Sequence, residues 1–147
     1  MSRSPLIPFF ALLLLLAPPA LSSLDQVKSE VNPDRRAKAA IDYAGVAEKN
    51  AESAYAKDDV QGAAAELKNV QESLEAAQDA FRAAHKTPGR NPGPFKYAEL
   101  RSRELLIRLG DLERKMESGD RGLIAEVKAK VQELHDAWFE GIMERKK

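Results

Sequence analysis

Residues 59–85 carry a seven-residue repeat of apolar side chains, and this repeat restricts the fold more than any other feature of the chain. One register consists of Val60, Leu67, Leu74 and Phe81, and the second, three residues later, of Ala63, Val70, Ala77 and Ala84. Apolar positions separated alternately by three and four residues lie along one side of an α-helix. The pattern therefore predicts a helix of about four heptads that packs at a small angle against another long helix.

The segment before this repeat, 33–57, predicts a partner helix with very small seam residues. Its seam positions are alanines seven residues apart, namely Ala37, Ala44 and Ala51. The pair Asn32-Pro33 is typical of a helix start, with asparagine as the N-cap and proline in the first turn. Because alanine allows two helix axes to approach to about 8 Å, we expect 33–57 and 59–85 to form a tight antiparallel hairpin.

The remainder of the chain repeats this architecture with larger side chains. Residues 86–94 (KTPGRNPGP) predict a loop because of their prolines and glycines, and helices are predicted at about 95–116 and 120–144. The connections are short, longer and short, which predicts an all-α, antiparallel four-helix bundle made of two long helical hairpins. The alternative is that the two hairpins dock end to end or pair between chains.

The first 22 residues have the composition of a secretory signal peptide. Arg3 supplies a positive charge, an apolar stretch runs from Leu6 to Leu16, and Ala20-Leu21-Ser22 offers small residues for cleavage near Ser22/Ser23. The apolar stretch is short and contains Pro8, which favours cleavage over the alternative of an uncleaved membrane anchor. Residues 23–147 are then a single helical domain that is periplasmic or secreted.

Composition limits the functions open to this domain. The chain has no cysteine, which excludes disulfides, thiolate zinc sites, c-type haem attachment and a cysteine nucleophile. It has 23 basic and 23 acidic residues, and the leader holds one of the basic ones, so the mature chain is nearly neutral. A neutral domain is a poor candidate for binding nucleic acid. The mature chain also has no apolar run long enough for a transmembrane helix.

The sequence predicts no catalytic residues, no cofactor and no metal site. His85 and His135, with Met116 and Met143, are the only candidates for axial ligands of a haem. His85 more simply ends a helix, and His135 lies just off the apolar seam. A carboxylate-bridged metal site would need a glutamate three residues before a histidine, where Gln132 stands. No serine lies in a glycine-flanked turn of the kind that presents a nucleophile.

Two surfaces are candidates for binding a partner. The first gathers cations and aromatic rings around the loop: Lys86, Arg90, Phe95, Lys96 and Tyr97. They suit an anionic envelope component or an acidic protein, although a rigid crossover with solubilising lysines is the simpler interpretation. The second is Phe139, which points about 100° away from the seam residue Trp138. Phe139 either packs under the amphipathic lead 23–31, whose apolar residues are Leu24, Val27 and Val31, or anchors a partner.

These features predict an exported, non-enzymatic helical bundle that acts by protein–protein or cell-envelope interaction. The partner is an unidentified protein or envelope component, or a second copy in a homodimer, since uninterrupted heptads favour helical pairing. The alternative is a carrier that holds a small ligand, haem or metal in the bundle interior.

Overall fold

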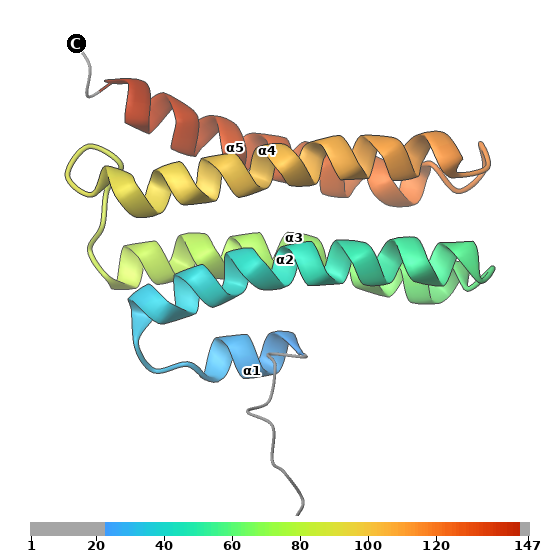
Figure 1. Cartoon of the computed structure of the whole chain (residues 1–147), viewed down its shortest axis with the longest axis horizontal. Helices are drawn as coiled ribbons and strands as arrows, with labels where there is room; N and C mark the ends of the chain where they lie inside the picture. The colour runs from blue at the N-terminus through green and yellow to red at the C-terminus, as the bar shows by residue number, and fades with distance from the viewer. Residues whose placement is uncertain (1–22, 145–147) are drawn as a thin grey trace, which may run out of the picture.

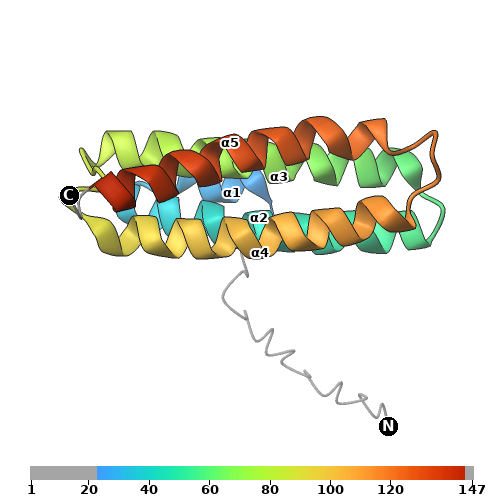
Figure 2. The same cartoon turned by 90° about the horizontal axis from the view of Figure 1, so that it is seen from above.

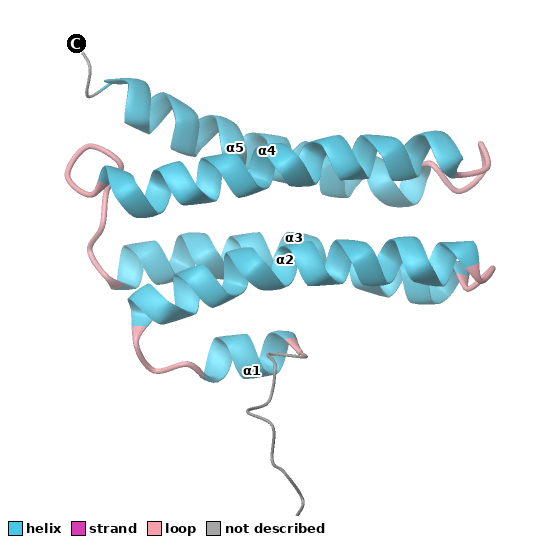
Figure 3. Cartoon of the chain, in the orientation of Figure 1, coloured by secondary structure: helices cyan, strands magenta, loops and turns pink. Residues whose placement is uncertain are grey.

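Residues 23–144, which the computed structural model describes, contain five α-helices and no strand (Figures 1 and 3). The helices are α1 (Leu24–Ser29), α2 (Pro33–Ala56), α3 (Val60–Ala83), α4 (Pro92–Lys115) and α5 (Gly122–Glu144). The prediction of an all-α helical bundle is confirmed. The helix count rises from four to five because the amphipathic lead forms α1. The predicted signal peptide, 1–22, lies outside the described residues.

The four long helices form two antiparallel hairpins stacked in two layers. In Figures 1 and 2 the α4–α5 hairpin lies over the α2–α3 hairpin, with α4 on α2 and α5 on α3. Helices α2 and α4 begin at the same end of the bundle, so neighbouring helices of different hairpins run parallel (Figure 1). The segment 84–91 crosses the bundle diagonally from α3 to α4. That end of the bundle is called the loop end below.

The α2–α3 hairpin is held together by small side chains, as the alanine seam predicts. The fully buried alanines of the two helices are Ala40, Ala44, Ala47, Ala51, Ala63, Ala77 and Ala80. Among the described helices, α2 and α3 make the most extensive contact. The heptad residues Leu67, Leu74 and Phe81 are buried between the layers, whereas Val60 and Ala84 at the two ends of the repeat are half-buried.

Side-chain caps explain where α2 and α3 begin. The Asn32 side chain accepts a hydrogen bond from the Arg35 amide at 3.1 Å, and Asp59 accepts one from the Gly62 amide at 2.9 Å. A Cβ atom at position 62 would lie 2.1 Å from a carboxylate oxygen of Asp59, so a larger residue there would have to displace the capping side chain. Asp58 makes the preceding turn with a φ of 61°, a conformation that aspartate tolerates better than most residues.

The prediction of a loop over 86–94 is wrong for its last three residues, because α4 starts at Pro92 and not at 95. Pro92 and Pro94 occupy the first and third positions of the helix. The amides of a first helical turn have no partner within the helix, so proline loses nothing there and its fixed φ suits the helix. The loop is therefore shorter than its proline and glycine content predicts.

Two other predicted boundaries move by about one half-turn. Helix α3 ends at Ala83 and not at 85, and His85 follows with a φ of 54°. Helix α5 begins at Gly122 and not at 120. Asp120 accepts a hydrogen bond from the Tyr55 hydroxyl at 2.9 Å, and that hydroxyl accepts one from the Glu117 amide. Tyr55 thus joins the two hairpins at the end opposite the loop end.

Helix α1 packs on α2 and α3, on the face away from α4 and α5 (Figure 1). Leu24 and Val27 are buried, but Val31 lies beyond the helix and is 89% exposed, so it does not belong to the apolar strip predicted for the lead. Because α1 is on the opposite side of the bundle from α5, the prediction that Phe139 packs beneath the lead is wrong.

Candidate functional site

A cavity of about 230 Å³ opens at the loop end, where α2 and α4 begin side by side. Its lining comes from three helices and the diagonal loop: Asp34, Lys38, Ile41, Phe81, Lys86, Pro94 and Tyr97. Ile41 and Phe81 are core residues, whereas Lys38 and Asp34 are exposed. The cavity therefore has an apolar floor and a charged rim.

Two ion pairs form this rim. Lys86 of the loop reaches Asp34 of α2 at 2.8 Å, and Lys38 reaches Asp42 at 2.7 Å. The Tyr97 hydroxyl donates a short hydrogen bond to the same Asp42 carboxylate, and the Lys38 ammonium lies 5.2 Å from the centre of the Tyr97 ring. Burial raises the pKa of Tyr97, and its bond to the Asp42 carboxylate raises the pKa further. Tyr97 is therefore a neutral donor at physiological pH.

The structure brings only part of the predicted loop surface to this cavity. Lys86 and Tyr97 line it, whereas Arg90 and Lys96 are exposed and do not. Phe95 is 2% exposed, so its prediction as an interaction residue is wrong. It packs on Phe81 with ring centroids 4.3 Å apart. As the fourth residue of α4 it points inward, toward α3.

Contact with α5 holds the loop in place. A Cβ atom at Gly141 would lie 2.6 Å from the Pro88 ring, so α5 needs a glycine where the loop crosses it. The contact between Pro88 and Gly141 agrees with the interpretation of the loop as a rigid crossover. The loop can be a rigid crossover and also form part of the cavity, because its residue Lys86 lines the cavity.

The second predicted surface, Phe139, lies on an open groove between α4 and α5. The groove is lined by Glu99, Arg103, Leu106, Ile107, Gln132, His135, Asp136 and Phe139. Phe139 is 42% exposed, and its ring stacks on that of His135 with an interplanar angle of 8°. It is therefore accessible to a partner.

His135 connects two carboxylates in this groove. Its Nε2 lies 3.1 Å from Glu99 and its Nδ1 lies 3.1 Å from Asp136, while Arg103 makes a short ion pair with Glu99. Burial alone would raise the pKa of Glu99, but the hydrogen bonds and charges of Arg103 and His135 outweigh burial and hold the pKa below its usual 4.5. Hydrogen bonds from His135 and Gln132 also lower the pKa of Asp136.

Little in the sequence points to this cluster of His135, Glu99, Asp136 and Arg103. Glu99 and Arg103 are four residues apart and match a solvent-exposed helix pair, yet Glu99 is buried. Charged residues four apart usually mark a solvated helix face, and here that holds for Arg103 but not for Glu99. The only available signal was that Glu99 directly follows the inward position Ala98.

The haem and metal candidates do not come together. His85 is exposed beyond the end of α3, and both ring nitrogens of His135 contact carboxylates. Met116 is buried at the end of the bundle opposite the loop end, and Met143 is exposed. Within residues 23–144, no three His, Cys, Asp or Glu side chains are placed to hold a metal ion.

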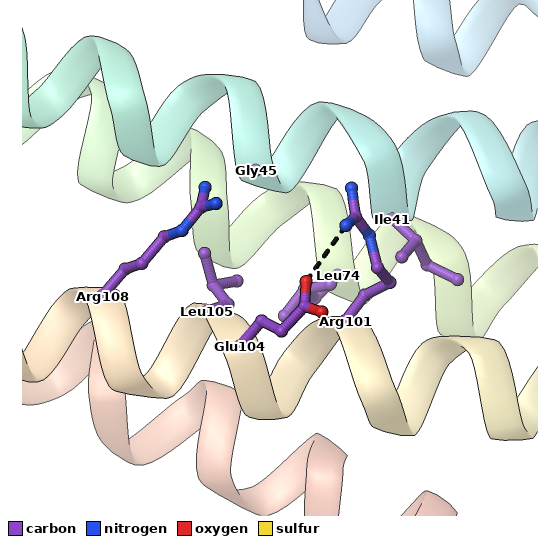
Figure 4. Close-up of a pocket in the computed structure, with 7 residues that line it drawn as sticks. All are labelled: Ile41, Gly45, Leu74, Arg101, Glu104, Leu105 and Arg108. Atoms are coloured by element: carbon purple, nitrogen blue, oxygen red, sulfur yellow. Dashed lines mark hydrogen bonds and ion pairs between the residues drawn. The ribbon is translucent and has the colours of Figure 1, made fainter.

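A third polar feature lies between α2 and α4, and Figure 4 shows it. Arg101 and Arg108 extend from α4 toward α2 beside a crevice of about 20 Å³, which has room for about one water molecule. Arg108 also lies 3.9 Å from Glu48, whose carboxylate is fully buried without a hydrogen bond. Burial raises the pKa of Glu48, with the Glu52 charge adding and Arg108 opposing.

Together, the described residues define an all-α protein of two stacked hairpins with a rimmed cavity at the loop end and an amphipathic groove on α4–α5. No helix in 23–144 has both the length and the apolarity needed to cross a bilayer. No family model, curated protein or solved structure matches the chain. Its function is therefore inferred from the geometry of these two sites.

Proposed function

We propose that the protein is an exported, non-enzymatic helical bundle that binds a second copy of itself through the outer face of its α4–α5 hairpin. The outer face consists of Leu100, Arg103 and Ile107 on α4 and of Gln132, Asp136, Phe139 and Met143 on α5. Residues three, four and seven apart lie on one side of a helix, so each set follows the groove between the two helices.

The clustering of exposed apolar side chains supports this proposal most strongly. Among the described residues, the exposed large apolar side chains are Val31, Val46, Leu100, Ile107, Leu123, Phe139 and Met143. Four of these seven lie on the outer face, and Ile107 is 62% exposed. Single exposed apolar residues need no explanation, but a cluster rimmed by polar groups is typical of an interaction surface.

Charge complementarity favours a second copy as the occupant. Helix α4 carries six basic and four acidic residues, whereas α5 carries two basic and five acidic ones. A two-fold axis parallel to the helices places α4 of each copy over α5 of the other. Arg103 on α4 of each copy then faces α5 of the other copy, which carries Asp136, and Ile107 and Phe139 lie in the same groove as these two residues.

The whole outward side of the α4–α5 hairpin, of which the outer face is the apolar part, is large enough for a stable dimer. A helix of 24 residues, such as α4, is about 36 Å long, and two packed helices are about 20 Å wide. Each copy therefore offers about 700 Å², close to the roughly 800 Å² that each partner buries in a standard protein interface.

The variant Ile107→Glu is expected to be monomeric, because it places an unpaired charge at the centre of the apolar cluster. Val46→Glu is the matched control, since Val46 is also exposed but lies on α2. Light scattering coupled to gel filtration measures the molar mass of each mature variant, and circular dichroism verifies its helix content. Dissociation of the Val46 variant, or a persistent dimer of the Ile107 variant with native helix content, would contradict the proposal.

Export is supported by the leader and by the start of the fold. The Ser23 side chain caps α1 by accepting a hydrogen bond from the Gln26 amide at 3.3 Å. Cleavage between Ser22 and Ser23 therefore keeps every described helix and its cap. The full-length chain expressed in a bacterium is expected outside the cytoplasm, with Ser23 as its first residue by mass spectrometry. Retention of Met1 in the cytoplasm or membrane would rule out this processing.

A further inference from the structure

The cavity at the loop end has the composition of a binding site for a small ligand. Its floor and walls are aliphatic and aromatic: Ile41, Phe81, Pro94 and Tyr97. Small-molecule sites are mostly apolar, with a few placed polar groups that fix the orientation of the ligand. Here those groups are the two lysines and the aspartate of the rim.

Lys86 is the polar group best placed to orient a ligand. Its side chain is only 25% exposed, so its ammonium is held against the cavity and not spread into solvent. An ammonium has three donors, and the recorded partner of Lys86 is Asp34, whose side chain is 55% exposed. Because the Asp34 partner is solvent-exposed, the ion pair is screened and weak, so a carboxylate that enters the cavity competes effectively for Lys86.

The weaker of the two rim ion pairs leaves Lys86 as the group that favours an anionic ligand. The lining contains the cations Lys38 and Lys86 and the anion Asp34. Lys38 is held by Asp42, which also accepts a hydrogen bond from Tyr97. A ligand carboxylate therefore competes with Asp34 for Lys86. Both cations lie at the rim, whereas the floor contributes Phe81 and Ile41. A ligand with its charge at one end and an apolar body at the other matches this division.

The volume limits the apolar body to about one ring. An apolar cavity of about 150 Å³ accommodates benzene, and this cavity measures about 230 Å³. The remaining space suits a short arm that ends in a carboxylate. Haem is far too large for this volume.

We propose that this cavity binds a small monocarboxylic acid with a single aromatic ring or a branched aliphatic body, with its carboxylate on Lys86 and its body against Phe81 and Tyr97. The cavity lies between α2 and α4, away from the α4–α5 outer face. Ligand binding is therefore independent of the proposed dimer, and either proposal can fail without the other.

Phenylacetate, benzyl alcohol and acetate are the probes that test the proposal. Titration of each into the mature protein is followed by NMR, with the ring signals of Phe81 and Tyr97 as reporters. Phenylacetate is expected to shift these signals with a dissociation constant in the millimolar range or below. Benzyl alcohol, which lacks the charge, is expected to bind at least about tenfold more weakly, since charged hydrogen bonds are the stronger ones. Acetate, which lacks the ring, is expected to leave the signals unchanged.

Three variants separate the role of Lys86 from a general charge effect. Lys86→Gln is expected to weaken phenylacetate binding about tenfold, to the level of benzyl alcohol, and Lys86→Arg is expected to retain it. Lys96→Gln is the matched control, because Lys96 is an exposed neighbour outside the lining. Unchanged thermal melting verifies that each variant is folded.

Three results would contradict the proposed binding of a monocarboxylic acid. Absence of shifts at Phe81 and Tyr97 with phenylacetate at about 10 mM, a concentration that detects even weak ligands, would overturn it. Equal binding of phenylacetate and benzyl alcohol would overturn the assignment of a carboxylate. If Lys96→Gln weakens phenylacetate binding as much as Lys86→Gln does, binding depends on the overall charge of the protein, and the assignment of Lys86 is overturned.

Discussion

Replacing Trp138 by alanine is expected to lower the free energy of unfolding by about 3–5 kcal/mol, the usual range for a fully buried tryptophan. The Trp138 side chain is 1% exposed, and its ring meets that of Phe81 edge-on at 6.2 Å. Phe81 in turn packs on Phe95. Trp138 therefore joins α5 to an aromatic cluster that also includes α3 and α4.

The expected decrease in the free energy of unfolding of Trp138→Ala has a second cause. The indole Nε1 donates a hydrogen bond of 2.7 Å to the side chain of Gln78, and truncation leaves this partner without its donor. The next residue, Phe139, is the matched control, because its ring is 42% exposed. Phe139→Ala is expected to change the free energy of unfolding by less than about 1 kcal/mol.

Chemical denaturation followed by circular dichroism gives both values by linear extrapolation. Because dimerisation also stabilises the folded state, the two variants are compared in the Ile107→Glu background, where the chain is expected to be monomeric. Equal effects of the two substitutions would contradict the assignment of Trp138 to the core and of Phe139 to the surface.

Replacing Glu48 by methionine is expected to raise the free energy of unfolding at pH 7 by about 1–3 kcal/mol, although it removes a charged contact. Glu48 is fully buried and lacks a hydrogen bond, and its ion-pair partner Arg108, at 3.9 Å, is 46% exposed. The carboxylate thus loses its hydration without gaining a close partner. Methionine has similar length and fills such a site without this penalty, and Arg108 remains hydrated.

The pH dependence of this effect follows from the raised pKa of Glu48. Because the folded state holds the proton more tightly than the unfolded state, whose pKa is 4.5, folding is favoured below pH 4.5. This stabilisation is lost as the pH rises through the pKa of the folded state. The gain from methionine is therefore expected to be small in acid and to grow as the pH rises.

Glu133→Gln is the matched control for Glu48. Glu133 lies on α5, away from Glu48, and its side chain, which pairs with Lys130 at 3.3 Å, is 68% exposed. Exposed pairs contribute at most about 1 kcal/mol, so this variant is expected to show little change at any pH. Denaturation curves between pH 4 and pH 8 measure the difference from the unmodified chain. A Glu48→Met variant that is less stable at pH 7, or whose gain is independent of pH, would contradict this account of Glu48.

The sequence predicts the core of this fold well, for a physical reason. Helix periodicity places Leu67, Leu74 and Trp138 on inward faces, and the structure buries all three. The alanine seam likewise predicts that α2 and α3 pair closely. Both signals are local, because they depend only on which side of a helix a residue occupies.

The way in which the two hairpins pack on each other could not be predicted from the sequence. Periodicity does not determine that α2 and α4 are parallel neighbours, and the cavity depends on that arrangement because Asp34 and Tyr97 meet only there. The composition of the loop pointed to Lys86 and Tyr97 but also to Phe95, since a sequence shows an aromatic residue without showing whether its ring is buried. Glu48 and Glu99 were missed because a charged residue near a seam matches the surface pattern until its neighbours are known.

Sedimentation equilibrium of the unmodified mature chain tests most directly whether the α4–α5 outer face pairs with a second copy. We predict twice the monomer mass at about 100 µM, well above a micromolar dissociation constant, and a shift toward monomer on dilution. The dissociation constant is predicted to rise between low and high salt, because screening weakens the attraction between the basic α4 and the acidic α5. A monomer mass at every concentration and in both salts would contradict the account.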